Sequence, residues 1–101
     1  MTKKLKLEEL GRIDVETFKK TPKISLVVIL DNVRSMHNVG AIFRTADAFL
    51  VEKIVLCGIT PQPPHREIHK AALGATESVD WIYEQDINAA IDNLKKENFN
   101  I

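Results

Sequence analysis

Residues 26–49 read LVVILDNVRSMHNVGAIFRTADAF, and this stretch decides the fold. The aliphatic run from Ile24 to Leu30 is typical of a parallel-sheet strand that is buried on both faces. A polar turn is predicted from Asp31 to His37, and a helix from Asn38 onward. Open α/β sheets bind ligands at the carboxyl ends of their strands, so the turn and the start of this helix are where we look for chemistry. The predicted helix has apolar residues at spacings of three and four on one face, which packs on the sheet: Val39, Ile42, Phe43, Ala46, Phe49 and Leu50.

Strands and helices continue to alternate after this helix. Lys53 to Cys57 is predicted as a second strand, and the proline-rich segment 58–64 as a loop. A further helix is predicted from His65 to Leu73, with Gly74 in the position that commonly ends a helix.

The last part of the sequence repeats this alternation. Val79 to Tyr83 is predicted as a third strand, and Asp86 caps a final helix whose last turn carries Lys95 and Lys96. Phe99 to Ile101 reads as the opening of a fourth strand. The order predicts an α/β fold with a parallel sheet and right-handed βαβ crossovers.

Composition limits the class of protein. With 101 residues, 45% hydrophobic and 28% charged, the chain has room for one small domain. It contains no apolar run long enough to cross a membrane, and we expect a cytoplasmic protein. The single cysteine, Cys57, lies in an apolar run and is predicted to be a buried packing residue.

The amino-terminal segment differs in charge from the rest. Residues 1–23 hold seven basic and four acidic groups, whereas residues 24–101 hold seven basic and ten acidic groups. We predict a basic helical arm over 1–23, with short helices at Leu5–Leu10 and Asp14–Lys20, and one α/β domain over 24–101. The arm either contacts nucleic-acid phosphates or presents an ordinary solvated helix face.

Asn38 and Arg44 are the candidate catalytic residues. At about 100° per residue they do not share a helix face, but the long Arg44 side chain can reach round toward the strand ends. A guanidinium there can clamp a phosphate or polarise a hydroxyl. The alternative is that Asn38 is an ordinary N-cap and that Arg44 pairs with Asp47 on the surface.

The helix predicted from His65 carries the candidate RNA-binding residues Arg66, His69 and Lys70. They form either a basic rim for RNA phosphate or a plain solvated face. His65 and His69 have the spacing of zinc ligands, but Glu67 lies one position too late for the His-Glu-x-x-His motif, and no metal site is predicted.

Trp81 and Tyr83 alternate along the third strand and therefore share a face. Such a pair can stack on a base, but core or interface packing is the commoner role of aromatic residues.

The string NVGAIFRTAD, from Asn38 to Asp47, closely resembles the first motif of the SpoU (TrmH-like) branch of the SPOUT RNA methyltransferases. The segment from Lys70 to Ala75 resembles the Lys and Gly-Ala region of the same enzymes, and the resemblance covers about residues 24–83. It implies the amino-terminal half of an α/β-knot fold in a homodimer with its site near the subunit interface. It also implies methyl transfer from S-adenosylmethionine to a ribose 2′-hydroxyl of tRNA or rRNA. Arg44 matches the arginine that activates this hydroxyl, and Asn38 the asparagine that shapes the site.

The sequence departs from the family pattern in two places. Leu50 stands where the family commonly has glycine. The later motifs, a Glu-containing loop and a Ser-Leu-Asn segment that build the knot and hold S-adenosylmethionine, have no counterpart after Tyr83. The knot region is therefore expected to be absent, and no cofactor-binding residue is assigned. A non-catalytic RNA-binding or partner-binding α/β module is the alternative function.

Overall fold

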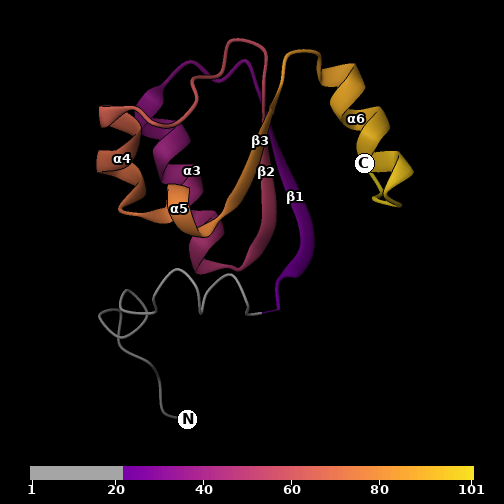
Figure 1. Cartoon of the computed structure of the whole chain (residues 1–101), viewed down its shortest axis with the longest axis horizontal. Coiled ribbons are helices and arrows are strands. Elements are labelled where there is room, and N and C mark those ends of the chain that lie inside the picture. The colour runs from indigo at the N-terminus through magenta and orange to yellow at the C-terminus, as the bar shows by residue number, and fades with distance from the viewer. Residues whose placement is uncertain (1–21) are drawn as a thin grey trace, which may run out of the picture.

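The computed structural model describes residues 22–101 as a parallel three-stranded sheet with helices on both faces (Figure 1). The strand order is β1-β2-β3, so the predicted α/β fold with βαβ crossovers is confirmed. The arm helices predicted over Leu5–Leu10 and Asp14–Lys20 lie outside the described residues. The elements are β1 (Ile24–Asp31), α3 (Met36–Ala48), β2 (Val51–Cys57), α4 (Arg66–Ala72), α5 (Ala75–Ser78), β3 (Asp80–Glu84) and α6 (Ile87–Lys96).

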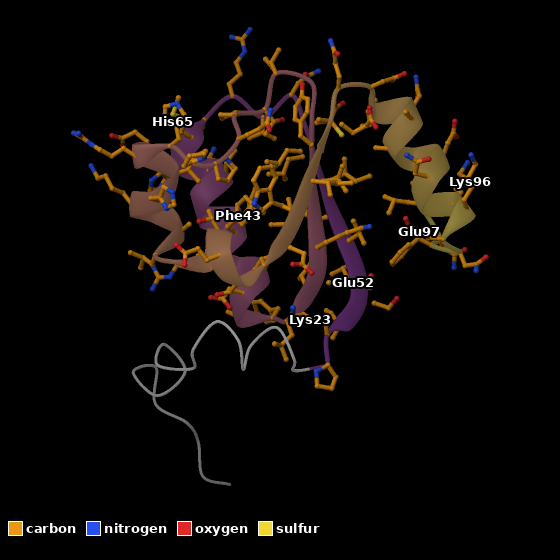
Figure 2. All side chains as sticks on the ribbon, viewed as in Figure 1. Lys23, Phe43, Glu52, His65, Lys96 and Glu97 are labelled. Atoms are coloured by element: carbon orange, nitrogen blue, oxygen red, sulfur yellow. The ribbon has the colours of Figure 1, made fainter. Side chains whose placement is uncertain are left out.

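The helices divide between the two faces of the sheet. Helices α3, α4 and α5 lie on one face and α6 lies on the other (Figure 1). Successive residues of a strand point to opposite faces, so Ile54 and Leu56 of β2 join the larger core, whereas Val55 and Cys57 pack with Ala90 of α6. Phe43 points from α3 into the larger core and is fully buried (Figure 2). The predicted burial of Cys57 is confirmed.

The prediction that β1 is buried on both faces is wrong. β1 pairs only with β2 among residues 22–101, and Ile24 and Leu26 are each 48% exposed. The strand that is buried on both faces is β2, because it has a strand on either side and helices above and below. Phe99 to Ile101 is not a strand in the structure; the Phe99 N–H donates to the Leu94 carbonyl at 3.0 Å and closes the end of α6.

Helix α3 begins two residues earlier than predicted. Ser35 is the N-cap, because its Oγ accepts a hydrogen bond from the Asn38 N–H at 3.1 Å. His37 and Asn38 therefore lie in the first turn of the helix, and Asn38 is not the cap. Phe49, predicted on the packed face, follows the last turn and is 67% exposed. The predicted cap of α6 is confirmed, since Asp86 Oδ1 accepts from the Asn88 N–H at 2.9 Å.

The turn between α4 and β3 contains a helix that the sequence did not indicate. Leu73 and Gly74 both have positive φ, 52° and 90°, and reverse the chain after α4. The single helical turn α5 follows at once, and Ala75 at its start is buried in the larger core. β3 consequently starts one residue later than predicted.

Leu50 marks the exit from α3. Its φ is 56°, in the left-handed region that costs a residue with a side chain about 1–2 kcal/mol. The backbone here is one that glycine adopts freely, which explains why glycine suits this position. The Leu50 side chain packs against the larger core instead.

Gly40 allows α3 and α4 to approach closely. A Cβ atom on Gly40 would lie 2.4 Å from the Ile68 carbonyl oxygen and 2.7 Å from Ala71 Cβ, both in α4. Real side-chain atoms do not come this close. The position of α4 against α3 therefore depends on the missing side chain.

Candidate functional site

Two loops meet at the carboxyl ends of β1 and β2. Thr60, 3% exposed, joins them through its hydroxyl: Oγ1 accepts from the Val33 N–H at 3.0 Å and lies 2.7 Å from the Cys57 carbonyl oxygen, to which it donates. Asn32 Oδ1 accepts from the Ile59 N–H at 2.9 Å. These bonds fix the segment that leads into α3.

Replacing Thr60 by Val should lower the free energy of unfolding by about 1–3 kcal/mol, because the partly buried Val33 N–H loses its acceptor. Urea denaturation followed by the fluorescence of Trp81 measures this change. The matched control is Thr76→Val, because Thr76 Oγ1 is buried and has no hydrogen-bond partner in residues 22–101. The control should be neutral or slightly stabilising, and equal losses in both variants would contradict the role of Thr60.

A surface hollow of about 530 Å³ lies between α3 and α4. Arg44 reaches it from α3 and Lys70 from α4, and both side chains are exposed. Two cations from different helices therefore border the same space. The lining residues are His37, Ala41, Arg44, Thr45, Ala48, Phe49, Lys70 and Ala71.

Arg44 has no ion-pair partner within residues 22–101. Lys70, by contrast, lies 3.8 Å from Glu67 Oε1 at the solvent-exposed surface, where such pairs contribute little. The predicted alternative, an Arg44 pair with Asp47, is not formed. Burial raises the pKa of the Asp47 carboxyl, and the positive charge that opposes this shift belongs to Lys23. Among residues 22–101, no carboxylate therefore competes with an anion for the Arg44 guanidinium.

The structure does not bring Asn38 and Arg44 into one pocket. Asn38 is exposed in the first turn of α3 and does not line the hollow. Arg44 follows Met36 by eight positions, about 12 Å along a helix that leads away from the carboxyl end of β1. The expectation that Arg44 reaches toward the strand ends stays a prediction, and the structure places the Arg44 side chain in the lining of the hollow beside α4.

His37 lines the hollow and was missed by the sequence analysis. His37, Ala41, Arg44 and Ala48 recur at spacings of four, three and four on the outer side of α3. This periodicity is visible in the sequence. The apolar positions of α3 mark the face that packs against the sheet, whereas these four residues lie on the face beside it.

Arg66 and His69 are exposed on α4 and lie outside the lining of the hollow, unlike Lys70. His65 precedes the first turn of α4, near the outer edge of the molecule (Figure 2). Residues 22–101 contain no group of three or more histidine, cysteine, aspartate or glutamate side chains that is arranged to hold a metal ion.

Trp81 and Tyr83 have structural roles. Trp81 packs against the larger core, and the Tyr83 hydroxyl donates to the Gly58 carbonyl at 2.5 Å. Burial raises the pKa of the Cys57 thiol, and the nearby carboxylates of Asp31, Glu84 and Asp86 raise it further. This thiol is thereby kept protonated and is a poor nucleophile.

The hollow does not fit S-adenosylmethionine as an enclosing pocket. Ligands of this size are bound in clefts that cover most of their surface, with a few fixed polar groups. None of the residues that line the hollow is fully buried. The hollow suits a phosphate or sugar edge that remains partly in solvent.

The fold and the hollow define a parallel α/β domain with a cationic surface site on its first crossover. The family model described as SpoU rRNA Methylase family matches residues 25–101. The chain therefore belongs to the SpoU methylase family. In agreement, the described residues form a parallel sheet of the SPOUT kind without the knotted region. No helix in residues 22–101 has the length and apolar character needed to span a membrane.

Curated relatives match most of this chain. A putative TrmH family tRNA/rRNA methyltransferase of Staphylococcus epidermidis is 35% identical over 81 residues, covering 80% of this chain and 32% of the relative. The 23S rRNA (guanosine-2′-O-)-methyltransferase RlmB of Coxiella burnetii is 33% identical over 99 residues, covering 89% of this chain and 38% of the relative. The chain thus spans about a third of the length of these relatives.

Solved structures share the fold. The AdoMet-bound rRNA methyltransferase of Sinorhizobium meliloti is 27% identical, with a TM-score of 0.63 over 84% of this chain and 30% of that protein. The SpoU methyltransferase AviRb of Streptomyces viridochromogenes has a TM-score of 0.69 over 79% of this chain and 31% of its own. Its identity of 19% shows a common fold alone.

Proposed function

We propose that this chain is the amino-terminal portion of an RNA ribose 2′-O-methyltransferase that uses S-adenosylmethionine and acts on tRNA or rRNA. The observation that carries the proposal is the pair of exposed cations, Arg44 and Lys70, on one hollow of a SpoU-family domain. The relatives named above are methyltransferases of rRNA or tRNA, which supports the substrate class.

Arg44 would orient the ribose hydroxyl and stabilise negative charge as it develops on that oxygen. A guanidinium remains protonated at any physiological pH, so Arg44 is a donor and not a base. The absence of an ion-pair partner within residues 22–101 leaves its donors available for the RNA. Lys70, across the hollow, would hold a neighbouring phosphate and fix the position of the sugar.

Asn38 would shape the turn before α3, where its backbone N–H is already held by Ser35 Oγ. Arg66 and His69 would extend the phosphate contacts along the exposed side of α4. The basic segment 1–23 would act as an arm on the same RNA. Because the hollow does not enclose S-adenosylmethionine, residues outside this chain would hold the cofactor.

The outer side of α3 also supports the homodimer that the family resemblance implies. Phe49 is 67% exposed and lines the hollow next to Arg44. A second subunit would cover this aromatic side chain and place the site near the interface. The proposed location of the protein is the cytoplasm.

Lys70→Ala should weaken binding of the 101-residue chain to a short RNA hairpin about 3- to 10-fold at low salt, through loss of one phosphate contact. The slope of log K against log salt should fall by about one. Fluorescence anisotropy with a labelled hairpin measures both quantities. Lys95→Ala and Lys96→Ala are the matched controls, because these residues lie in the last turn of α6 on the other face of the sheet. An equal effect of the α6 variants would show nonspecific attraction and contradict the proposed RNA site.

A further inference from the structure

One end of the hollow between α3 and α4 carries a histidine that the proposed function does not use. His37 lies in the first turn of α3, its side chain is exposed, and it lines the same hollow as Arg44 and Lys70. Among the described residues, the lining of this hollow contains no aspartate or glutamate. The hollow therefore combines two permanent cations with a side chain of the kind whose charge changes near neutral pH.

The geometry of α3 places His37 and Arg44 on one surface of the helix. They are seven positions apart, which is two turns and about 10 Å along the helix axis. Ala41 lies between them, and its small side chain leaves this surface open. Side chains on a helix lean toward its amino end, so the preferred direction of the long Arg44 side chain is toward Ala41 and His37. The two basic residues therefore border one continuous surface.

The length of this surface suits an extended polyanion better than a single phosphate. Side chains whose helix positions are about 10 Å apart contact successive groups along a nucleic-acid backbone more readily than one small anion. Residues 24–101 carry seven basic and ten acidic groups, so any attraction of this domain for RNA must be local. One additional positive charge in the hollow would be a large part of that attraction.

The charged groups around His37 are mostly basic. Across the hollow they are Arg44 on α3 and Lys70 on α4. Arg34 precedes α3, and Glu67 of α4 lies 3.8 Å from the Lys70 ammonium; neither belongs to the lining. α5 and β2, which also pack against α3, contribute no residue to the lining. A phosphate that enters the hollow brings negative charge to His37, and negative charge favours the protonated imidazole.

We infer that His37 is a phosphate contact of the RNA site and that it binds RNA in its protonated form. RNA affinity then rises as the pH falls through the range in which histidine changes charge, because binding takes up a proton. His37 is the lining residue nearest along the chain to the end of β1, so the bound RNA backbone runs along α3 from Arg44 toward that end. The inference rests on the proposed RNA site, but it does not require methyl transfer.

The pH dependence of RNA binding tests this inference. Fluorescence anisotropy with a labelled hairpin compares the 101-residue chain at about pH 5.5 and about pH 8, on either side of the range in which histidine titrates. Affinity at low salt should be about 3- to 10-fold higher at the lower pH. The slope of log K against log salt should also be steeper by about one at the lower pH, since one more cation contacts phosphate.

Two substitutions isolate the contribution of His37. His37→Gln removes the charge and should abolish most of the difference between the two pH values. His37→Lys supplies a permanent cation, so it should bind at about pH 8 as tightly as the wild type binds at about pH 5.5. The matched control is His65→Gln, because His65 precedes the first turn of α4 and does not line the hollow. Asp47, whose carboxyl pKa is raised by burial, is present in every variant and affects all of them equally.

Proton uptake provides a measurement on the wild type that needs no variant. Calorimetric titration with the same hairpin, at about pH 6.5 in two buffers of different ionisation enthalpy, reports the number of protons taken up on binding. Uptake of a fraction of one proton is expected for the wild type and for His65→Gln, and almost none for His37→Gln. Near-ultraviolet circular dichroism of Trp81 shows that the fold is retained at both pH values.

Three results would overturn the inference. One is a wild-type affinity that is constant with pH or falls in acid. Another is a pH dependence that survives His37→Gln; if it disappears in His69→Gln, the titrating contact lies on the exposed side of α4. The third is a His37→Lys protein that binds no more tightly than the wild type at the higher pH.

The same data separate this inference from the proposed function. Weaker binding in Lys70→Ala, without any pH dependence in the wild type, would overturn the role of His37 alone. RNA binding that responds to neither Lys70→Ala nor His37→Gln, or an absence of binding at both pH values, would overturn the proposed RNA site as well.

Discussion

Arg44→Ala should lower kcat/KM for RNA methylation at least about 100-fold in the fused protein that joins this chain to the carboxyl-terminal portion of its Coxiella burnetii relative. Removing one donor that stabilises developing negative charge typically costs about 2.7–4 kcal/mol in the transition state. Arg44 has no ion-pair partner in residues 22–101, so the substitution leaves no buried charge behind and the fold should be unaffected. Transfer of a tritiated methyl group to RNA, with mass spectrometry of the modified nucleoside, measures the effect and its position.

Two further variants define the role of Arg44. Arg44→Lys keeps the charge but loses the planar fork of donors, and it should recover only part of the activity. Lys95→Ala, on the far face of the sheet, should methylate RNA at the normal rate. Full turnover by Arg44→Ala would remove this residue from the mechanism, and methylation of a base instead of a ribose would contradict the proposed reaction.

The same measurement separates the proposed enzyme from a non-catalytic RNA-binding module. The hollow is compatible with simple RNA binding, because none of its lining residues is fully buried and it is open to solvent. A module of this kind would bind RNA through Lys70 and show no methyl transfer in the fused protein. Transfer that depends on Arg44 would exclude it.

Gly40→Ala should lower the free energy of unfolding by about 3 kcal/mol, and Gly40→Val by more. Alanine normally favours a helix over glycine by about 1 kcal/mol, so the intrinsic preference of α3 acts in the opposite direction. The new Cβ would lie 2.4 Å from the Ile68 carbonyl oxygen, which belongs to the backbone of α4 and cannot rotate away. Overpacking of this kind typically costs about 1–3 kcal/mol and sometimes more.

Urea denaturation with an unchanged m-value would report this loss. Gly74→Ala is the informative comparison, because a Cβ there meets no atom within 4 Å but the φ of 90° is unfavourable. It should cost only about 1–2 kcal/mol through backbone strain. A Gly40→Ala protein as stable as the wild type would show that α3 and α4 can separate without loss of stability.

Because Arg44 and Lys70 border one hollow across these helices, Gly40→Ala should also weaken RNA binding.

Local signals in the sequence predicted most of the elements. The aliphatic run before Asp31, the helical spacing of Val39, Phe43 and Ala46, and the cap at Asp86 each depend on residues a few positions apart. The hydrogen bonds and side-chain contacts that form a single helix, strand or cap also join residues only a few positions apart in the sequence. Such patterns were therefore readable without knowledge of the packing.

The errors concern neighbours that are distant along the chain. Ile24 and Leu26 have the composition of buried strand residues, yet they are exposed because β1 has only one strand beside it among the described residues. The role of Thr60 was not predicted, since its partners are Val33, in the loop after β1, and Cys57, the last residue of β2. α5 was missed because two left-handed residues, of which only Gly74 is a glycine, reverse the chain before it.

The sequence by itself determined that this protein has a parallel α/β domain of the SpoU methylase family, with Arg44 on its first crossover helix. Only the tertiary structure decided that Arg44 and Lys70 line one hollow, and that β1 has a strand on one side only among residues 22–101. The physical reason is that side-chain periodicity specifies which face of a helix is apolar, whereas the close approach at Gly40 sets which helix lies beside it. Two cations on different helices form one site only after that packing is complete.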